Sequence, residues 1–118
     1  MENKKVIISI IMPTLNCDKT IRMPLESIRK QNFDQNLIEI LVIDGGSSDK
    51  TLEIAKEFDC IVLKNEKKLP EFAKHIGILK ANGKYAVFLD SDEVFSNADA
   101  LNNRLEIFKE TDAKIIVT

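Results

Sequence analysis

Short, almost wholly apolar runs alternate along the chain with longer stretches of helical periodicity. The runs are rich in Ile, Val and Leu and are bounded by polar loops, as β-strands are. Few polar residues interrupt them, which favours strands covered on both faces, as in a parallel sheet. The predicted strands are 6–12, 38–43, 60–63, 85–89 and 115–117.

Apolar residues recur every three or four positions between these runs and predict four helices. The predicted helices are 21–30, one that begins after Ser48 or Asp49, one from Pro70 to about Asn82, and one from about Asn97. We expect Thr20 or Asp18 to cap the first helix. In the third helix, the spacing predicts an inward face made of Phe72, Ile76 and Leu79.

The order of these elements predicts an α/β fold with a doubly wound, mainly parallel sheet flanked by helices. Ligands bind to such sheets beyond the carboxyl ends of the strands, where the strand order reverses. If the order is 3-2-1-4, the polar loops 13–17, 44–49 and 90–93 meet at that point. The sequence therefore predicts a ligand site at this edge.

Composition limits the function classes. The chain has 118 residues and is 44% hydrophobic, which suits one domain with a single core. Its 17 basic and 19 acidic residues alternate, so no basic face indicates nucleic acid. Cys17 and Cys60 lack the spacing of a zinc site or a disulfide framework, and a reducing cytoplasm is expected. No apolar run approaches the roughly 20 residues of a transmembrane segment.

Acidic residues follow the fourth predicted strand directly, as Asp90, Ser91, Asp92 and Glu93. Crowded carboxylates repel one another unless water or a cation relieves them. Mg²⁺ or Mn²⁺ takes one or two carboxylates and completes its coordination with water and phosphate oxygens. The loop therefore predicts a metal that binds a nucleotide diphosphate, although a solvated acidic turn that caps the next helix would have the same composition.

A second polar loop, from Asp44 to Asp49, follows the second predicted strand. Its two glycines allow the backbone to approach a flat ligand closely. Asp44 could accept hydrogen bonds from a base or ribose, or it could simply belong to a tight turn before a helix. The spacing alone leaves these two interpretations open. No glycine-rich dinucleotide motif and no P-loop lysine is present.

Three motifs in order resemble those of family 2 glycosyltransferases of the GT-A fold, over nearly the whole chain. They are Pro13-Thr14-Leu15-Asn16, the stretch 43–49 and the stretch 88–93. The resemblance implies a Rossmann-like nucleotide-binding half and inverting transfer of a sugar from a nucleotide-sugar donor, with a UDP-sugar favoured, to an acceptor hydroxyl. It also implies the site residues. Pro13, Thr14 and Asn16 would line the nucleotide pocket, Asp44 would contact the base, Asp90 would face the ribose and Asp92 would ligate the metal.

Two departures from the family pattern are informative. Where similar proteins tend to have Ala-Arg-Asn followed by Gly, this chain has Ala73, Lys74, His75, Ile76 and Gly77. Lys74 supplies a positive charge near phosphate but not the two-pronged contact of arginine. Similar proteins also continue for about another hundred residues or more, with the acceptor site and the general base.

Residues 1–118 are therefore interpreted as a single nucleotide-sugar-binding domain, truncated before the acceptor-binding half. The general base is expected outside this chain, and the acceptor is expected to be a glycan or lipid-linked. The expected location is the cytoplasm, with the inner face of the membrane as an option for the full-length protein. Apolar surface left by the truncation makes a homo-oligomer a further expectation.

Two alternatives remain open at this point. One is a catalytically incomplete module that only binds a nucleotide diphosphate. The other is a phosphatase of the haloacid-dehalogenase type, because Asp90 to Val94 also fits the acidic motif of that family. That motif ends the first strand of its fold, and only 26 residues follow Asp92 here, so the transferase is favoured.

Overall fold

Five parallel strands form one sheet in the order β3-β2-β1-β4-β5. The computed structural model describes residues 5–108 and 115–117, with side chains for residues 5–107. The strands are β1 (Ile8–Thr14), β2 (Ile38–Asp44), β3 (Ile61–Lys64), β4 (Tyr85–Phe88) and β5 (Ile115–Val117). The α/β fold and the order 3-2-1-4 are therefore confirmed, and β5 adds one strand beyond β4.

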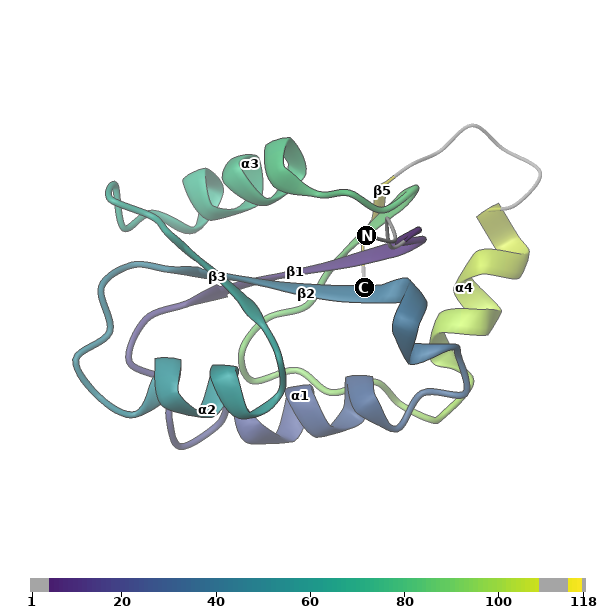
Figure 1. Ribbon diagram of the computed structural model, residues 1–118, viewed down its shortest axis with the longest axis horizontal. Helices are drawn as coiled ribbons and strands as arrows, with labels where there is room; N and C mark the ends of the chain where they lie inside the picture. Colours follow the sequence, from purple (N-terminus) through teal and green to yellow (C-terminus); the bar gives the residue numbers. More distant parts are fainter. Residues whose placement is uncertain (1–4, 109–114, 118) are drawn as a thin grey trace.

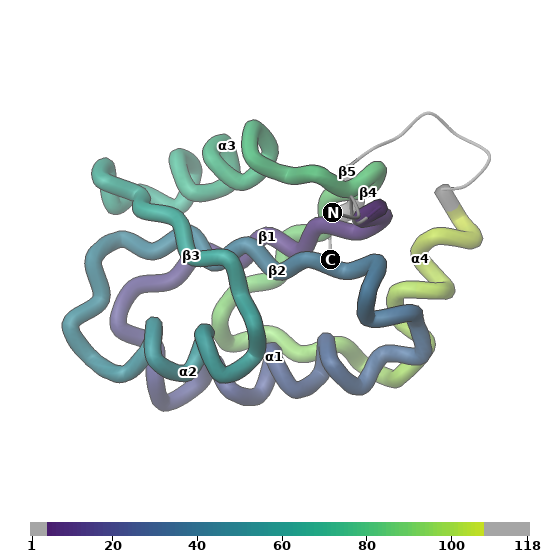
Figure 2. Tube along the Cα trace, viewed as in Figure 1, coloured from purple at the N-terminus to yellow at the C-terminus, as the bar shows by residue number. Residues whose placement is uncertain are grey.

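Helices cover both faces of this sheet (Figure 1). They are α1 (Arg22–Arg29), α2 (Thr51–Glu57), α3 (Pro70–Lys80) and α4 (Ala100–Phe108), with a short 3₁₀ turn, η1 (Gln35–Leu37), before β2. The tube in Figure 2 shows α3 on one face and α1 and α2 on the other. No helix in the described part of the chain is long and apolar enough to cross a membrane.

The sheet separates two apolar clusters, because successive strand residues point to opposite faces. Ile10 belongs to the larger cluster, which includes apolar residues of α1, α2 and α4. Ile11 belongs to the smaller cluster, beside Ala73 of α3. All residues of β2 are buried, whereas β3 at the edge is half exposed. The apolar runs of the central strands thus match burial on both sides, as predicted.

The inward face of α3 differs from the prediction. Phe72 and Leu79 are 40% and 69% exposed, and only Ile76 of the expected three is partly buried. Ala73 and Gly77 are the buried residues instead. A Cβ atom on Gly77 would lie 2.4 Å from Cγ2 of Ile11, so the helix packs too closely on β1 for a side chain there. Because α3 lies so close to β1, only small residues such as Ala73 and Gly77 fit between them.

The predicted cap of α1 is also wrong. The N-cap residue is Ile21, and no side chain caps the helix. Thr20 donates its hydroxyl to the carbonyl of Cys17, and Asp18 accepts a hydrogen bond from the backbone of Lys50, before α2. The side chains of Thr20 and Asp18 therefore stabilise loops and do not cap α1.

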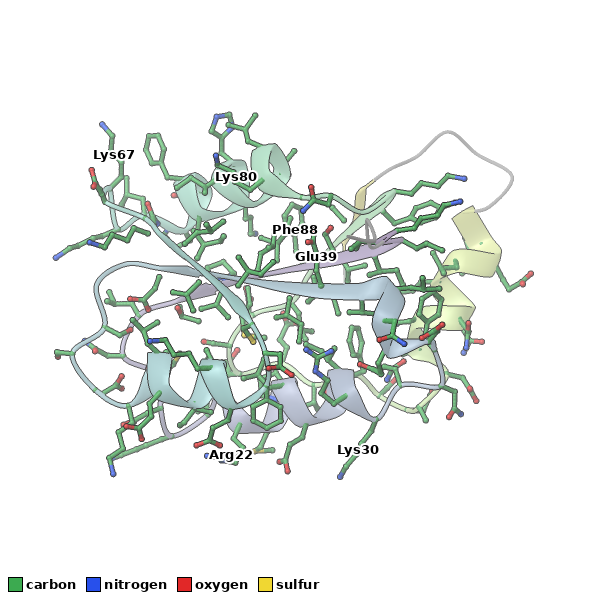
Figure 3. The ribbon with its side chains drawn as sticks, viewed as in Figure 1. Arg22, Lys30, Glu39, Lys67, Lys80 and Phe88 are labelled. Atoms are coloured by element: carbon green, nitrogen blue, oxygen red, sulfur yellow. The ribbon has the colours of Figure 1, made fainter. Side chains whose placement is uncertain are left out.

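A buried polar contact ties the end of α3 to the sheet. The carboxylate of Glu39 accepts hydrogen bonds from the Ser9 hydroxyl at 2.5 Å and from the Asn82 backbone at 2.7 Å. Figure 3 shows Glu39 and Phe88 on the α3 side of the sheet. Because the chain enters β4 just after Asn82, this contact fixes the start of the strand that leads to Asp90.

Candidate functional site

The loops that follow β1 and β2 are joined by reciprocal hydrogen bonds at the carboxyl edge of the sheet. The backbone N–H of Asn16 donates to the Ser47 hydroxyl, and the Asn16 side-chain oxygen accepts from the Ser48 backbone, both at 2.8 Å. Asn16 has a φ of 49°, a left-handed conformation that asparagine tolerates better than most residues. The two loops predicted to meet therefore form one connected unit.

A second pair of bonds of the same kind extends this unit. The Asp18 backbone donates to the Asp49 carboxylate, and the Lys50 backbone donates to the Asp18 carboxylate, both at 3.2 Å. Asp49 also accepts from the Thr51 backbone at 2.9 Å, so it satisfies an N–H at the start of α2. The N-cap residue of α2 is nevertheless Lys50, without a side-chain cap, so the expectation that Ser48 or Asp49 caps this helix is wrong.

Asp44 is the centre of the β2 loop and is only 5% exposed. Its Oδ1 atom accepts from the hydroxyls of Thr14 at 2.7 Å and Ser47 at 2.6 Å. Its Oδ2 atom accepts from the backbone N–H groups of Gly46 at 2.9 Å and Ser47 at 2.7 Å. Burial acts to raise the pKa of Asp44, but these hydrogen bonds outweigh it and the pKa is lowered. Asp44 is therefore ionised at neutral pH and organises the loop.

Strand register explains why Thr14 reaches Asp44. The two residues are paired in the parallel register of β1 and β2. Gly46 has a φ of +107°, which only glycine adopts without strain, and this turn brings its N–H back to the carboxylate.

The acidic loop follows β4 next to the end of β1. The paired register of these strands stops at Ile11 and Phe88, so β1 continues past β4 through Pro13 and Thr14. Asp90 and Asp92 are exposed, between the buried anchors Leu89 and Phe95. This arrangement places Pro13 in a wall beside the acidic loop.

Glu93 closes the acidic loop on itself. Its carboxylate accepts from the Asp90 backbone at 2.9 Å, and its own N–H donates to the Asp90 carbonyl at 3.0 Å. A carboxylate used in this way holds the turn that presents Asp92. It is poorly placed to remove a proton from an acceptor.

A cavity of about 490 Å³ joins several of the predicted residues. It is lined by Pro13, Thr20, Pro70, Lys74, Asp90, Ser91 and Asp92. The Lys74 ammonium lies 5.5 Å from the centre of the Phe88 ring, which favours a cation above its face. The cavity thus combines one positive side chain with two carboxylates, a charge pattern suited to a metal–diphosphate group.

Two carboxylates, those of Asp90 and Asp92, line this cavity among the described residues. No cluster of three or more His, Cys, Asp or Glu side chains able to hold a metal occurs among the described residues. Mg²⁺ and Mn²⁺ accept such a small protein contribution when phosphate oxygens and water supply the rest. The residues present therefore fit a metal that arrives with a nucleotide diphosphate better than a permanently bound ion.

A second cavity, of about 580 Å³, lies against the β2 loop. Its lining residues are Asp44, Gly45, Gly46, Ser47, Leu52, Val62, Lys64, Asn65, Glu66 and Lys68. Sequence reasoning missed Asn65, which is 4% exposed and has a buried Oδ1 atom without a hydrogen-bond partner. The available signal was its position directly after β3, at the same edge as the other loops.

The largest of the described cavities, about 790 Å³, lies at the opposite edge of the sheet. It is lined by Val6, Ile38 and Ile61 at the beginnings of strands, and by Arg29, whose guanidinium is bonded to Gln35 and to the Phe58 carbonyl. None of the predicted site residues lines this cavity. We therefore place the candidate site at the carboxyl edge, where the charged loops converge.

Comparison with known proteins gives a consistent result. The family model described as "Glycosyl transferase family 2" matches residues 9–118. A dolichyl N-acetyl-alpha-D-glucosaminyl phosphate 3-beta-D-2,3-diacetamido-2,3-dideoxy-beta-D-glucuronosyltransferase from Methanococcus voltae is 36% identical over 109 residues. That alignment covers 86% of this chain and 34% of the relative.

Two solved structures share the fold. TarS 1-349 from S. aureus in complex with UDP-GlcNAc has a TM-score of 0.78 and 28% identity, with 89% of this chain and 32% of that fragment covered. Glucosyl-3-phosphoglycerate synthase from Mycobacterium tuberculosis, in complex with Mn²⁺, UDP and glucosyl-3-phosphoglycerate, has a TM-score of 0.67 and 28% identity. That comparison covers 86% of this chain and 39% of the synthase. The chain thus spans about a third of the length of the Methanococcus voltae relative and of these two solved chains, and 20% of full-length TarS.

Proposed function

The chain belongs to glycosyl transferase family 2, and we propose that it binds a nucleotide-sugar donor, with a UDP-sugar favoured, at the carboxyl edge of its sheet. The observation that carries the proposal is the shared cavity of Pro13, Lys74, Asp90 and Asp92. Residues from β1, α3 and the loop after β4 converge there. The proposal for the longer protein is transfer of the sugar to an acceptor hydroxyl with inversion.

The nucleoside is proposed to lie against the joined loops of β1 and β2. The cavity beside Gly45 and Gly46 offers the close approach that a flat base needs. Pro13, Thr14, Asn16 and Asp44 remain the predicted nucleotide-binding residues. Since the side chains of Thr14 and Asn16 are bonded to the β2 loop, their proposed contribution is to shape the pocket wall.

The diphosphate is proposed to lie between Lys74 and the acidic loop. Asp92 would ligate Mn²⁺ or Mg²⁺, Asp90 would face the ribose, and Lys74 would attract phosphate oxygens. When bound, the metal neutralises charge that develops on the departing diphosphate. The chain's own contribution is to hold both carboxylates in a turn closed by Glu93. The Mn²⁺ and UDP in the synthase structure support this choice of ligands.

A second candidate is a module that only binds the nucleotide diphosphate. The hydrogen bond of Glu93 favours it. The Glu93 carboxylate is the nearest one to Asp92 that could act as a general base, but it accepts from the Asp90 backbone within the loop. The general base and the glycan or lipid-linked acceptor site are accordingly proposed to lie outside this chain. Binding by the chain and transfer by the longer protein are compatible, and a transfer assay on the chain alone separates them.

Calorimetric titration with UDP, GDP and dTDP, each in Mn²⁺ and in EDTA, tests the site directly. We expect UDP to bind in Mn²⁺ and Asp92→Asn to weaken that binding by more than about tenfold, or about 1.4 kcal/mol. Asp59→Asn is the matched control, because this exposed aspartate lies at the opposite edge and loses the same charge. Failure of all three nucleotides to bind a folded chain in Mn²⁺ would refute the assignment.

A further inference from the structure

We propose that Gln31 and Ser27, at the end of α1, are positioning residues that hold the acidic loop in the geometry its metal requires. The inference rests on the proposed function. Asp92 lies in the connection between β4 and α4, residues 89–99, which has no helix or strand of its own. A metal ligand in such a connection keeps its place only when other parts of the protein hold the chain on both sides of it.

The side of the connection next to β4 is held by the sheet. The backbone N–H of Leu89 donates to the Ile11 carbonyl at 3.1 Å. Leu89 is 1% exposed and belongs to the larger apolar cluster, so its side chain is anchored as well. Asp92 is three residues further along the chain, and its position therefore also depends on what holds the residues after it.

The end of α1 holds the other side of the connection, which runs along this helix in Figure 1. The hydroxyl of Ser27, in the last turn of α1, accepts a hydrogen bond from the Phe95 backbone at 3.2 Å. Gln31 follows the helix. Its Nε2 group donates to the Asn97 carbonyl at 2.7 Å, and its Oε1 atom accepts from the Leu101 backbone at 3.0 Å. Two side chains thus join α1 to the chain on both sides of the start of α4.

Gln31 is a buried amide whose polar groups all have partners. It is 6% exposed, and its Nε2 group also donates to the Ser27 carbonyl at 3.3 Å. A flipped amide would direct Oε1 at two carbonyl oxygens and Nε2 at the N–H of Leu101, so one orientation is strongly favoured. Gln31 therefore fixes the distance between the end of α1 and the start of α4.

The Ser27 hydroxyl is held in one orientation as well. It donates to the Pro24 carbonyl at 2.8 Å, which leaves a lone pair for the Phe95 N–H. The Phe95 side chain is 7% exposed and packs in the same apolar cluster as α1. Phe95 is thus fixed through its backbone and its side chain, only three residues after Asp92.

Helix α1 also reaches the opposite wall of the cavity that contains Asp92. Thr20, which precedes α1, lines this cavity together with Asp90 and Asp92. The helix therefore connects one wall of the cavity to the segment that holds the acidic loop. If the bonds of Gln31 are lost, both carboxylates remain, but the metal has to order them when it binds, and this ordering lowers affinity.

The test compares UDP binding with and without metal. UDP is titrated calorimetrically into the unmodified chain and Gln31→Leu, in Mn²⁺ and in EDTA. In Mn²⁺ we expect Gln31→Leu to weaken binding by about tenfold or more, as is typical when a group that orients a metal ligand is lost. In EDTA the two proteins should bind UDP alike. A residue that only stabilises the fold would change neither dissociation constant while the chain remains folded.

Gln35→Leu is the matched control. Gln35 also follows α1, and its side chain also makes three hydrogen bonds, with Ile28, Arg29 and Gln31 rather than with the connection. We expect this variant to bind UDP in Mn²⁺ as the unmodified chain does. Ser27→Ala is a smaller change and should weaken binding in Mn²⁺ in the same direction, whereas Ser27→Thr keeps the hydroxyl and should restore it. This pair decides the question even if Gln31→Leu does not fold.

The outcomes separate this inference from the proposed function. Unchanged binding in Mn²⁺ by the folded variants of Gln31 and Ser27 would overturn the inference and leave the proposed nucleotide site standing. Equal weakening in Mn²⁺ and in EDTA, or equal weakening in Gln35→Leu, would also overturn it, because the effect would then not pass through the metal loop. Absence of UDP binding by the unmodified chain in Mn²⁺ would refute the proposed function and this inference with it.

Discussion

At the scale of single residues, the candidate site depends on side chains whose polar groups are already used within the protein. Thr14, Asn16 and Asp44 were predicted from the sequence to touch the nucleotide, and that role stays a prediction. The structure adds that each is bonded to the β2 loop. Local spacing could not show these bonds, because Thr14 and Asp44 are 30 residues apart and meet only through strand register.

Replacement of Asp44 by asparagine should destabilise the fold in a pH-dependent way. The amide cannot accept from both loop N–H groups and both hydroxyls, so we expect a loss of about 1–3 kcal/mol at pH 7. The pKa of Asp44 is lowered by folding, so its contribution is present above the pKa of the unfolded chain. That contribution is lost as the pH falls through the lower pKa of the folded state.

Urea unfolding at a series of pH values measures this effect. The stability difference between the unmodified chain and Asp44→Asn should shrink below about pH 4, where the aspartate of the unfolded chain takes up a proton. Asp59→Asn, which changes an exposed carboxylate, serves as the control. A difference that stays constant down to acid pH would show that the charge of Asp44 contributes nothing to the loop.

At the scale of elements, the strands were predicted well and one helix face was not. Strand runs were recognisable because the central strands are apolar on both sides. For α3, the pattern of large apolar residues indicated Phe72 and Leu79, yet Ala73 and Gly77 face the sheet. Periodicity weighs residues by hydrophobicity, whereas this interface is set by how closely the helix approaches β1. That distance depends on Ile11, 66 positions away from Gly77, and has no local signal.

Because α3 packs closely on β1, replacement of Gly77 by alanine should destabilise the fold. In Gly77→Ala, the new methyl group would lie 2.4 Å from Cγ2 of Ile11, so the helix has to move outward. We expect a loss of about 1–3 kcal/mol, the usual effect of overpacking, although alanine favours helix more than glycine does. Lys74 lies on the same helix, so nucleotide binding should weaken as well.

A double-mutant cycle with Ile11→Ala isolates the contact. Removal of the Ile11 side chain leaves space for the methyl group, so Gly77→Ala should cost much less stability in that background. Urea unfolding of the four proteins gives the coupling, and Lys80→Ala on the exposed side of α3 controls for helix propensity. Additive losses would mean that the cost of Gly77→Ala does not arise from contact with Ile11.

At the scale of the whole molecule, the fold and the meeting of the polar loops at one edge of the sheet were predictable, whereas the hydrogen bonds within the candidate site were not. The order of apolar runs and polar loops leads to a doubly wound parallel sheet, and the carboxyl ends of its strands then gather the three loops. Asn65 was missed because its lysine-rich surroundings resemble an ordinary surface turn, and only burial distinguishes it. The place of the candidate site therefore follows from the order of the elements, whereas the hydrogen bonds and burial within it appear only in three dimensions.

We expect residues 1–118 to unfold as one cooperative unit, so that ligands bound at this edge stabilise the whole chain. A ligand at a hundred times its dissociation constant adds about 2.7 kcal/mol, or roughly 10 °C in melting temperature. The described residues offer two carboxylates and no larger metal cluster, so Mn²⁺ alone should shift the melting temperature little. Mn²⁺ with UDP should shift it by more than the sum of the separate effects, because each ligand supplies part of the other's site.

Asp92→Asn should remove this synergy and leave the smaller shift with UDP alone, because the base and ribose contacts do not pass through the metal. Thermal melts of the chain with Mn²⁺, UDP, both, and both with EDTA give the four quantities needed. Asp59→Asn again provides the charge-matched comparison at the opposite edge. A shift with UDP and Mn²⁺ that is unchanged by EDTA would contradict the role of the metal but would still support nucleotide binding. A full shift with Mn²⁺ alone would instead require metal ligands beyond Asp90 and Asp92.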